Sequence, residues 1–401
     1  MKALSPDAHA FEIEPSDPRL AQCLEQFPPA VFSEGLYQSI ELIERYSIEL
    51  AIDLSQQLNI PHQLDDWRSA AEISRLLSFQ PSFRCALSWI LERVVEAGCA
   101  EAHGNGESRC YRLQHPLWEP DLKGLRAIGL HIDPNNAATL DLLDHVASLY
   151  PAAATSQQSG DGALLGPQGV PLWLKYFHNS NLTYAVNNWV AATLAADQLS
   201  TRRTLRILEI GAGTGSASET LLQLLGQRHL LSRIQRYLIT EPNAYFRRCA
   251  QRSLTAKYSG LPLEWAALDI DSSWQAQRVD AGEFDLVYAV NVMHISKNLI
   301  FSLSEARLSL ASDGCVVLGE CVRPYDNQPI YPEFMFQILS SFTNVETDPE
   351  FRPNPGFLTA EQWRRAFSRA GFARVSLAPD VERIREIYPH FFTGAICGQS
   401  A

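Results

Sequence analysis

Apolar and polar positions follow a regular order in the second half of the chain, where short apolar runs are separated by longer segments of helical period. Runs this short and rich in Val, Ile and Leu are typical of strands buried on both faces of a parallel sheet. Each run ends in a polar side chain, and the carboxyl ends of parallel strands meet along one edge of the sheet. The expected strands are 206–210, 236–241, 263–268, 284–290 and 315–319.

The first run opens directly into three alternating glycines, Gly211, Gly213 and Gly215, with Glu209 two residues before them. A strand, a glycine turn and a helix from 216 to about 229 form the nucleotide-binding half of a doubly wound sheet. The spacing G-x-G-x-G differs from the G-x-G-x-x-G of dinucleotide sites. A carboxylate beside the turn would repel phosphates, but it suits the ammonium and sulfonium charges of S-adenosylmethionine. The segment resembles motif I of class I methyltransferases.

Polar groups at the following strand ends complete a predicted site for this methyl donor. Glu241 ends the second strand, where carboxylates in such folds accept hydrogen bonds from ribose hydroxyls. Asp269 follows the third strand and could accept a hydrogen bond from an adenine amino group. Ile270 beside it and Asn291 after the fourth strand are also assigned to the cofactor site. One polar strand end is ordinary, but a series of them at one edge indicates a ligand site.

Composition favours an intracellular enzyme. The 401 residues, 46% of them hydrophobic, are enough for two domains with their own cores. A formal net charge of −12 argues against nucleic acid or an anionic membrane as the main partner. No apolar run is long enough to span a membrane and the N-terminus is polar and acidic, so we expect a cytoplasmic protein. The eight cysteines form no C-x-x-C pair, and no local ligand spacing predicts a metal site.

The chain is expected to fall into three parts, which are a helical N-terminal domain over 1–151, a linker and lid over 152–200, and a cofactor-binding core over 201–401. In the first part, helices near 70–77 and 85–97 followed by a short hairpin resemble a winged helix. The second of these helices carries few basic residues. Packing, dimerisation or covering of the substrate is therefore favoured over DNA binding.

Two aromatic-rich segments flank the predicted core. The first precedes the first strand and could fold over the cofactor crevice as a lid, or could pack on the edge of the sheet. The second follows the fifth strand and could form a wall of the substrate site, although a core helix that starts at Pro332 explains the same residues. The candidates are Tyr176, Phe177 and Trp189 for the lid, and Tyr331, Glu333 and Phe334 for the wall.

Four segments in series resemble the C-methyltransferase domains of polyketide synthases. They are L-L-G-x-x-G-x-P-L-W-L-x-x-F, I-L-E-I-G-A-G-T-G, F-D-L-V-Y-A-V-N-V-M-H and P-G-F-L-T-A-E-Q-W-R-R-A-F-S-R-A-G-F, and the resemblance runs from about residue 59 to the C-terminus. It implies a class I, Rossmann-like α/β doubly wound sheet with a helical, winged-helix-like N-terminal domain or lid. In that family, a His and a Glu after neighbouring strands form a dyad, and the matching residues here are His294 and Glu320.

The implied reaction is methylation of the α-carbon of a carrier-bound β-ketoacyl or malonyl thioester in natural-product biosynthesis, with S-adenosylmethionine as cofactor. A carbon flanked by a ketone and a thioester is acidic enough for one positioned imidazole to remove its proton near neutral pH. Glu320 would fix the tautomer of His294 and stabilise the imidazolium. The resulting enolate would attack the sulfonium methyl group in line.

The resemblance implies an acyl carrier protein or adjacent polyketide synthase modules as partners. Carrier proteins are generally acidic, so docking on this acidic chain would need local basic patches. Two other functions stay open, namely a small-molecule O-methyltransferase and a non-catalytic regulator that keeps the fold. The candidate basic patches are Arg202, Arg203 and Arg206, then Arg247, Arg248 and Arg252, and finally Arg364, Arg365 and Arg369.

Overall fold

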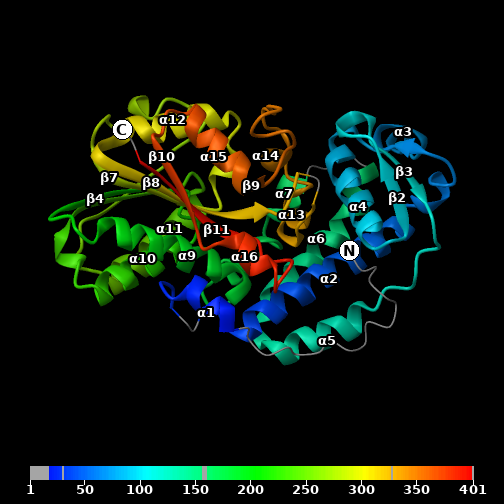
Figure 1. The fold of residues 1–401 in the computed structure, drawn as a ribbon, viewed down its shortest axis with the longest axis horizontal. Helices are drawn as coiled ribbons and strands as arrows, with labels where there is room; N and C mark the ends of the chain where they lie inside the picture. The colour runs from blue at the N-terminus through cyan, green and yellow to red at the C-terminus, as the bar shows by residue number, and fades with distance from the viewer. Residues whose placement is uncertain (1–17, 29–30, 156–159, 327, 400–401) are drawn as a thin grey trace. The chain divides into compact units, whose positions relative to one another are not determined.

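The computed structural model describes residues 18–28, 31–155, 160–326 and 328–399, which form two compact units (Figure 1). We call them the helical unit and the sheet unit. Over the described positions, the helical unit holds residues 34–176 and 328–344, and the sheet unit holds the rest. The chain therefore leaves the sheet unit after the fifth predicted strand, adds one segment to the helical unit, and returns.

One mixed sheet forms the centre of the sheet unit, with the strand order β6-β5-β4-β7-β8-β11-β10. Strands β4 to β8 pair in parallel, and β11 is antiparallel to both of its neighbours. The chain builds outward from β4 to β6 and then returns to add β7 and β8 on the other side, so the order reverses between β4 and β7. The strands are β4 Leu205–Ile210, β5 Ile234–Thr240, β6 Leu263–Ala266, β7 Phe284–Val290, β8 Leu310–Arg323, β10 Arg374–Ala378 and β11 Thr393–Gln399, while β9 Leu358–Thr359 pairs with the end of β8.

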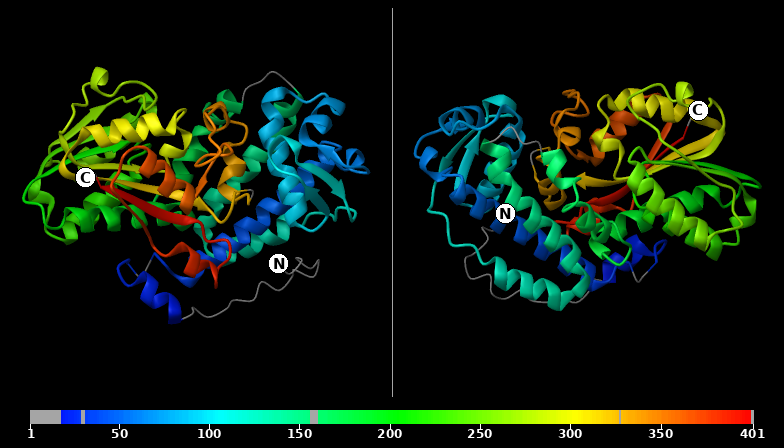
Figure 2. Two further views of the ribbon diagram at one scale, coloured as in Figure 1. Left: turned by 45° about the horizontal axis from the view of Figure 1, so that its top comes forward. Right: turned by 180° about the vertical axis from the view of Figure 1, so that it is seen from behind.

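Helices cover both faces of this sheet, with α9, α10 and α11 on one face and α12 and α15 on the other (Figures 1 and 2). α15 illustrates the local cause, because Thr359 and Gln362 close a capping box at its start and its apolar stripe buries Trp363 and Phe367. The predicted α/β doubly wound class is confirmed. The helices of this unit are α1 Pro18–Leu24, α9 Leu182–Leu199, α10 Ser216–Gln227, α11 Ala244–Lys257, α12 Leu299–Ser309, α15 Ala360–Arg369 and α16 Val381–Arg385.

The helical unit contains the expected winged-helix-like order of two helices and a hairpin. Its strands β1 Arg68–Ser69, β2 Ala100–His103 and β3 Cys110–Leu113 pair in the order β1-β3-β2. The long helix α2 is buried along most of its length and packs against α4, α5 and α6. None of the described helices is long and apolar enough to cross a membrane. The helices are α2 Glu34–Gln57, α3 Ala70–Leu76, α4 Arg84–Glu96, α5 Leu122–Ile132, α6 Ala137–Thr155, α7 Gly160–Leu164, α8 Val170–Tyr176, α13 Tyr331–Phe336 and α14 Ser340–Thr343.

The predicted end of the fifth strand differs from the structure. The fifth strand was expected to end at Gly319, but β8 continues to Arg323, because β11 pairs with it as far as Cys321 and β9 pairs with its last residues. Glu320 is therefore inside a strand and not beyond its end. The described part of segment 152–200, the predicted linker and lid, is largely helical and ends in α9, which packs on β8 and β11. Residues 156–159 of that segment lie outside the described residues.

Candidate functional site

The glycine turn between β4 and α10 has a backbone conformation that other residues rarely adopt. Gly211, Gly213 and Gly215 have φ values of 63°, 55° and 87°. A Cβ atom on Gly211 would meet Val292 Cγ2 at 2.6 Å, and one on Gly215 would meet Ala250 Cβ at 3.0 Å. A Cβ atom on Gly213 would meet no atom of the described residues within 4 Å. Packing thus requires the two outer glycines, whereas the middle one faces open space.

Glu241 follows β5, and its carboxylate lies against this turn. Oε2 accepts a hydrogen bond from Gly213 N at 2.8 Å, and Oε1 accepts one from Asn243 N at 2.7 Å. Burial raises the pKa of the Glu241 carboxyl, and the two backbone N–H groups oppose that rise because they stabilise the charged form. Each oxygen retains a second lone pair for a further donor. The structure therefore brings Glu241 and Gly213 together, as expected for parallel neighbouring strands.

Asp269 and Ile270 lie in the loop after β6. The Asp269 carboxylate accepts hydrogen bonds from Asp271 N at 3.0 Å and Ser272 Oγ at 2.8 Å, so a local turn fixes its orientation. Asp269 is exposed and Ile270 is half-buried. Both residues thus present surface at the carboxyl end of the sheet, where their predicted contact with adenine stays a prediction.

Glu209 differs from the other predicted cofactor residues because its carboxylate lies in the core. Its side chain is 1% exposed and accepts a hydrogen bond from the hydroxyl of Tyr237 on β5. Burial raises the pKa of Glu209 to about 7, while the hydrogen bond from Tyr237 opposes the rise. A carboxylate enclosed in this way offers little surface to a ligand. Its predicted contact with the cationic groups of the donor stays a prediction.

Asn291 turns the chain at the end of β7. Its φ of 54° lies in the left-handed region, which costs a residue other than glycine about 1 kcal/mol or more and is common at functional sites. Its backbone N donates to Gly319 O at 2.7 Å, and its Oδ1 accepts from Cys321 Sγ at 3.6 Å. The following residues then leave the sheet as a short 3-10 turn, Met293–Ile295, capped by Ser296, and we call residues 293–296 the His294 turn.

His294 and Glu320 form a buried hydrogen-bonded pair. His294 Nδ1 and Glu320 Oε2 are 2.8 Å apart, and their side chains are 3% and 0% exposed. The other oxygen, Oε1, accepts from Met293 N at 2.9 Å and from His294 N at 3.4 Å. A carboxylate at Nδ1–H selects the neutral tautomer whose basic atom is Nε2. His294 and Glu320, which were predicted to pair, are thus in contact. His294 lies just after the end of β7, and Glu320 lies in the interior of β8.

The three lid candidates belong to different units. Phe177 is the first residue of the sheet unit after the helical segment that ends at residue 176. Its ring centroid lies 5.3 Å from that of Tyr184 and 6.3 Å from that of Phe246. Trp189 lies half-buried on α9 of the same unit. Tyr176 ends α8 in the helical unit, where its ring packs edge-on against Trp173. The lid function of these residues stays a prediction.

The wall candidates Tyr331, Glu333 and Phe334 lie on α13 in the helical unit and are all buried. Phe334 stacks on Tyr150 with ring centroids 4.7 Å apart. Glu333 accepts a hydrogen bond from Trp89 Nε1 at 3.2 Å. These contacts are those of a core helix, which was the alternative explanation of the same residues. Contact with an acyl group stays a prediction.

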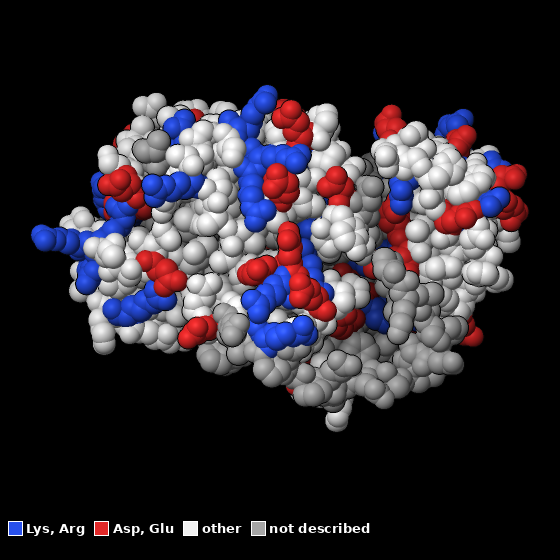
Figure 3. Space-filling model, in the orientation of Figure 1, with Lys and Arg blue, Asp and Glu red and all other residues white. Residues whose placement is uncertain are grey.

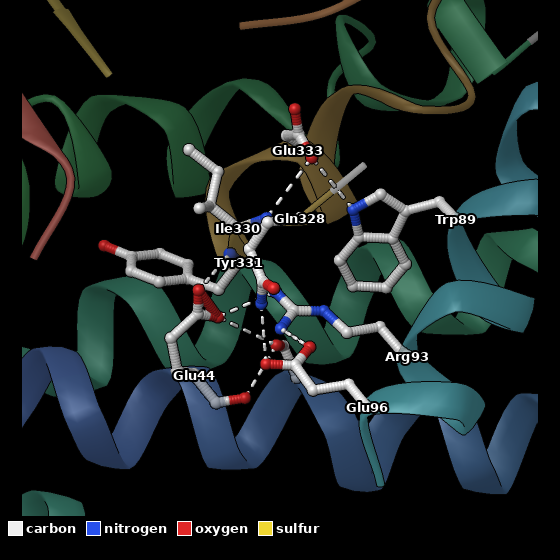
Figure 4. Close-up of polar contacts among 9 residues, drawn as sticks. Glu44, Trp89, Arg93, Glu96, Gln328, Ile330, Tyr331 and Glu333 are labelled. Atoms are coloured by element: carbon white, nitrogen blue, oxygen red, sulfur yellow. Dashed lines mark hydrogen bonds and ion pairs between the residues drawn. The ribbon is translucent and has the colours of Figure 1, made fainter. Parts of the chain in front are cut away.

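A buried ionic network connects the start of α13 to α2 and α4 (Figure 4). The Arg93 guanidinium, 0% exposed, binds Glu44 Oε2 at 2.7 Å and Glu96 Oε2 at 2.8 Å. Glu44 Oε1 also accepts from Tyr331 N at 2.9 Å, and Glu96 Oε1 accepts from Gln328 Nε2 at 2.8 Å. Removing one partner from such a pair leaves an uncompensated buried charge, at a cost of about 3–5 kcal/mol. The network therefore fixes segment 328–336 within the helical unit.

The arginine clusters considered for carrier docking are mostly engaged by acidic side chains. Figure 3 shows Lys and Arg side chains standing beside Asp and Glu on one face of the molecule. On α11, Arg247 donates to the backbone O of Glu241, while Arg248 and Arg252 are exposed. The helix α11 itself contains no acidic residue, so it retains a basic face. The ion pairs are Arg202 and Arg206 with Asp285, Arg364 and Arg365 with Glu361, and Arg369 with Glu350.

Two residues beside His294 were not expected from the sequence. The rings of His294 and Phe357 have centroids 4.3 Å apart, and Arg352 donates to the backbone O of His294. Phe357 stands in the P-G-F-L-T segment, which entered only as part of the resemblance, and Arg352 carries no motif or spacing signal. Among the described residues, no three His, Cys, Asp or Glu side chains are grouped to hold a metal ion.

Known proteins resemble both the sequence and the fold. Residues 208–316 match the profile of a family described as a methyltransferase domain. Over 252 residues, 61% of this chain, the sequence is 28% identical to the polyketide synthase PksR of Bacillus subtilis (strain 168), 10% of which is covered. The crystal structure of the carbon methyltransferase CurJ has a TM-score of 0.75 at 24% identity, with 96% of each chain covered. The trans-methyltransferase CalH in complex with SAH has a TM-score of 0.57 at 21% identity, with 90% of each chain covered.

These comparisons confirm the resemblance to polyketide synthase C-methyltransferase domains and the class I methyltransferase fold. At these identities, the likeness to CurJ and CalH shows the fold. The chain spans about a tenth or less of the length of the first curated relatives that it matches. The matched regions cover 10%, 7% and 6% of those proteins. Similarity over so small a share of those longer synthases does not by itself assign their activity or partners to this chain.

Glu209 generates a prediction about pH and stability. Its folded-state pKa is raised from 4.5 to about 7, so the folded protein binds this proton more tightly than the unfolded chain does. The contribution of protonated Glu209 to the free energy of unfolding is complete below about pH 4.5 and is lost as the pH rises through about 7. The pKa difference corresponds to a loss of about 3 kcal/mol. In urea unfolding, Glu209→Gln, which stays uncharged, should gain about this much stability relative to wild type between pH 4.5 and 8.

The exposed carboxylate of Glu361 provides the control, because Glu361→Gln should follow the wild-type pH profile. A stability difference between Glu209→Gln and wild type that stays constant across this range would contradict the buried ionisation of Glu209.

Proposed function

The chain carries a methyltransferase domain in a class I fold, and we propose that it transfers the methyl group of S-adenosylmethionine to the α-carbon of a carrier-bound acyl thioester. In this proposal, His294 is the base and Glu320 orients it. The observation that carries the proposal is the buried hydrogen bond from His294 Nδ1 to Glu320, placed at the carboxyl end of β7 beside the strand that ends in the glycine turn.

The residues around the glycine turn suit the methyl donor. The open space above Gly213 can take the amino-acid part of the donor, because a side chain there would meet no neighbour. Glu241 stands next to Gly213 with lone pairs left for ribose hydroxyls. The strand order reverses between β4 and β7, which is where ligands bind in open α/β sheets. The SAH complex of CalH, which shares the fold, supports the same choice of donor.

The names of two similar proteins favour an acyl thioester as the substrate. PksR is a polyketide synthase, and CurJ is a carbon methyltransferase. Carbon methylation of a thioester needs a base for a weakly acidic C–H bond, and a neutral imidazole supplies one near neutral pH. A carboxylate that holds Nδ1–H makes Nε2 the nitrogen that receives this proton. The dyad is thus the part of the site that matches carbon methylation.

In the proposed mechanism, two residues of the sheet unit, His294 and Glu320, act in successive steps. His294 Nε2 takes the α-proton, and the electron pair of the C–H bond is left on the substrate as an enolate. Glu320 stabilises the imidazolium through Nδ1, and the surrounding burial strengthens this interaction by excluding water. When bound, S-adenosylmethionine supplies an electrophilic methyl group. The new carbon–methyl bond would replace the sulfur–methyl bond of the donor, and His294 would then release its proton to water.

The deciding experiment is the intact mass of an acyl carrier protein loaded with malonyl or β-ketoacyl groups, incubated with the chain with and without S-adenosylmethionine. The proposal expects a donor-dependent gain of one methylene, with fragmentation placing the methyl group on the α-carbon. A methyl group on oxygen would indicate an O-methyltransferase. Absence of transfer to all of these substrates, despite donor binding, would overturn the proposed reaction.

Gly213 tests the donor site. Gly213→Leu should reduce affinity for S-adenosylmethionine by about a hundredfold or more, because the new side chain fills the space above the turn. Isothermal calorimetry measures this affinity. Gly282→Leu is a matched control, since Gly282 also has a positive φ, 72°, and open space around it, but lies in an exposed turn before β7. Equal affinities for the two variants would remove Gly213 from the donor site.

His294 tests the base. His294→Ala should lower the rate of methyl transfer by about a hundred- to ten-thousand-fold, as loss of a general base does, without weakening donor binding by more than about twofold. Single-turnover kinetics on a loaded carrier protein measure the rate. The exposed His115 serves as control, since His115→Ala should keep the wild-type rate. A variant that lacks His294 and still methylates at the wild-type rate would show that another group is the base.

The basic face of α11 tests carrier docking. Reversing its charge with Arg248→Glu and Arg252→Glu should lower kcat/KM for a carrier-bound thioester by about tenfold or more at low salt, and leave a free thioester mimic unaffected. Steady-state kinetics on both substrates provide the comparison. If wild type used carrier-bound and free thioesters with equal efficiency, docking of a carrier would be refuted.

A further inference from the structure

The His294 turn is held on both of its polar sides. On its N–H side, the Glu320 carboxylate accepts from Met293 N and His294 N. On its C=O side, the Arg352 guanidinium donates from Nη1 to Ser296 O at 2.6 Å and from Nη2 to His294 O. The peptide units that carry the imidazole therefore lie between a buried anion and a buried cation. Each charge is directed at the end of the backbone dipole that attracts it.

Arg352 itself is held rigidly by a loop that packs on the same turn. Its side chain is 0% exposed, and its backbone N and O form a reciprocal pair of 2.8 Å hydrogen bonds with Asp348. The backbone N of Glu346 donates to Lys297 O at 2.8 Å, which joins the loop to the chain just after the turn. Phe357, at the far end of the loop, packs its ring on the imidazole of His294.

The charge of Arg352 is retained although it is expensive to bury. Burial lowers the pKa of Arg352 to about 10, while the carboxylates of Glu320, Asp271 and Glu346 favour its charged form. The guanidinium is therefore cationic at neutral pH. A buried cation that donates its hydrogen bonds to two backbone carbonyls stabilises a fold less than apolar packing would. Stability alone therefore does not explain why Arg352 lies beside the proposed base.

We infer that Arg352 is a positioning residue for His294, which fixes the backbone of the His294 turn from the carbonyl side as Glu320 fixes it from the amide side. This inference rests on the proposed function, since it assigns to Arg352 the orientation of the proposed base. With Arg352 removed, the carbonyls of His294 and Ser296 lose these donors, so the ring can shift relative to the Glu320 carboxylate that selects its tautomer. A displacement of the ring by about 1 Å is enough to reduce a rate by about a hundredfold.

Two variants separate the charge of Arg352 from its shape. Arg352→Met removes the charge and both donors, and Arg352→Lys keeps the charge but loses the planar fork that reaches two carbonyls. We expect kcat for methyl transfer to fall about a hundredfold in Arg352→Met and about tenfold in Arg352→Lys, with donor affinity and KM within about twofold of wild type. Rates are expressed per donor-binding site, so that unfolded protein does not count.

Arg385 provides a matched control. It also donates to two backbone carbonyls, those of Phe391 and Val322, and burial also lowers its pKa to about 10, but it does not contact the His294 turn. Arg385→Met should lose stability as Arg352→Met does and should keep the wild-type kcat per donor-binding site. A purely structural role for Arg352 would make the two variants alike in kcat.

A second measurement tests the inference without any turnover. In the ¹⁵N NMR spectrum of histidine-labelled protein, wild type should show His294 as a single tautomer protonated at Nδ1, and Arg352→Met should show it as a mixture or as an exchange-broadened signal. Unchanged kcat and an unchanged single tautomer in Arg352→Met would overturn the inference, and if that variant does not fold, Arg352→Lys decides by the same two readouts. If wild type methylates no thioester, the proposed function fails, but the tautomer still decides the role of Arg352.

Discussion

One carboxylate holds the candidate site together. Glu320 accepts hydrogen bonds from two backbone N–H groups and from the ring of His294, at a place where its side chain is 0% exposed. A carboxylate buried this deeply must be matched by donors, because an unpaired buried charge costs several kcal/mol. The bonds that satisfy its charge are the same bonds that shape the turn and select the tautomer. Stability and chemistry therefore depend on one set of contacts.

The topology of the sheet places these contacts beside the glycine turn. β7 lies between β4 and β8 and is parallel to both, so the chain emerges from all three at the same edge. The left-handed conformation of Asn291 then bends the chain so that Val292 packs against Gly211 and His294 turns toward β8. A bulkier residue at position 211 would collide with Val292. The predicted donor site and the predicted base are thus coupled through direct packing of two loops.

Several residues that a motif or a segment marked as functional also have structural contacts. Glu209 belongs to the glycine motif, but its carboxylate bonds to Tyr237 in the core. Glu333 and Phe334 follow the fifth strand in sequence, yet they pack on α4 and α6 within the helical unit. In both cases the sequence could not tell which way the side chains of the segment point. Side-chain direction depends on partners far away in the chain, and no local period reports it.

The sequence by itself determined the sheet class and the glycine turn with its acids, and its resemblance to a known family paired His294 with Glu320. The class and the turn follow from the apolar runs, from positions whose backbone conformation favours glycine, and from strand ends that meet because parallel strands share one direction. Only the tertiary structure decided that β8 extends past Glu320, that residues 328–344 join the helical unit, and that Arg352 supports the His294 turn. β8 extends because β11, built from the last residues of the chain, supplies its pairing partner. Arg352 lies 58 residues from His294, and two positions so far apart are brought together by folding of the whole sheet unit and by no local rule.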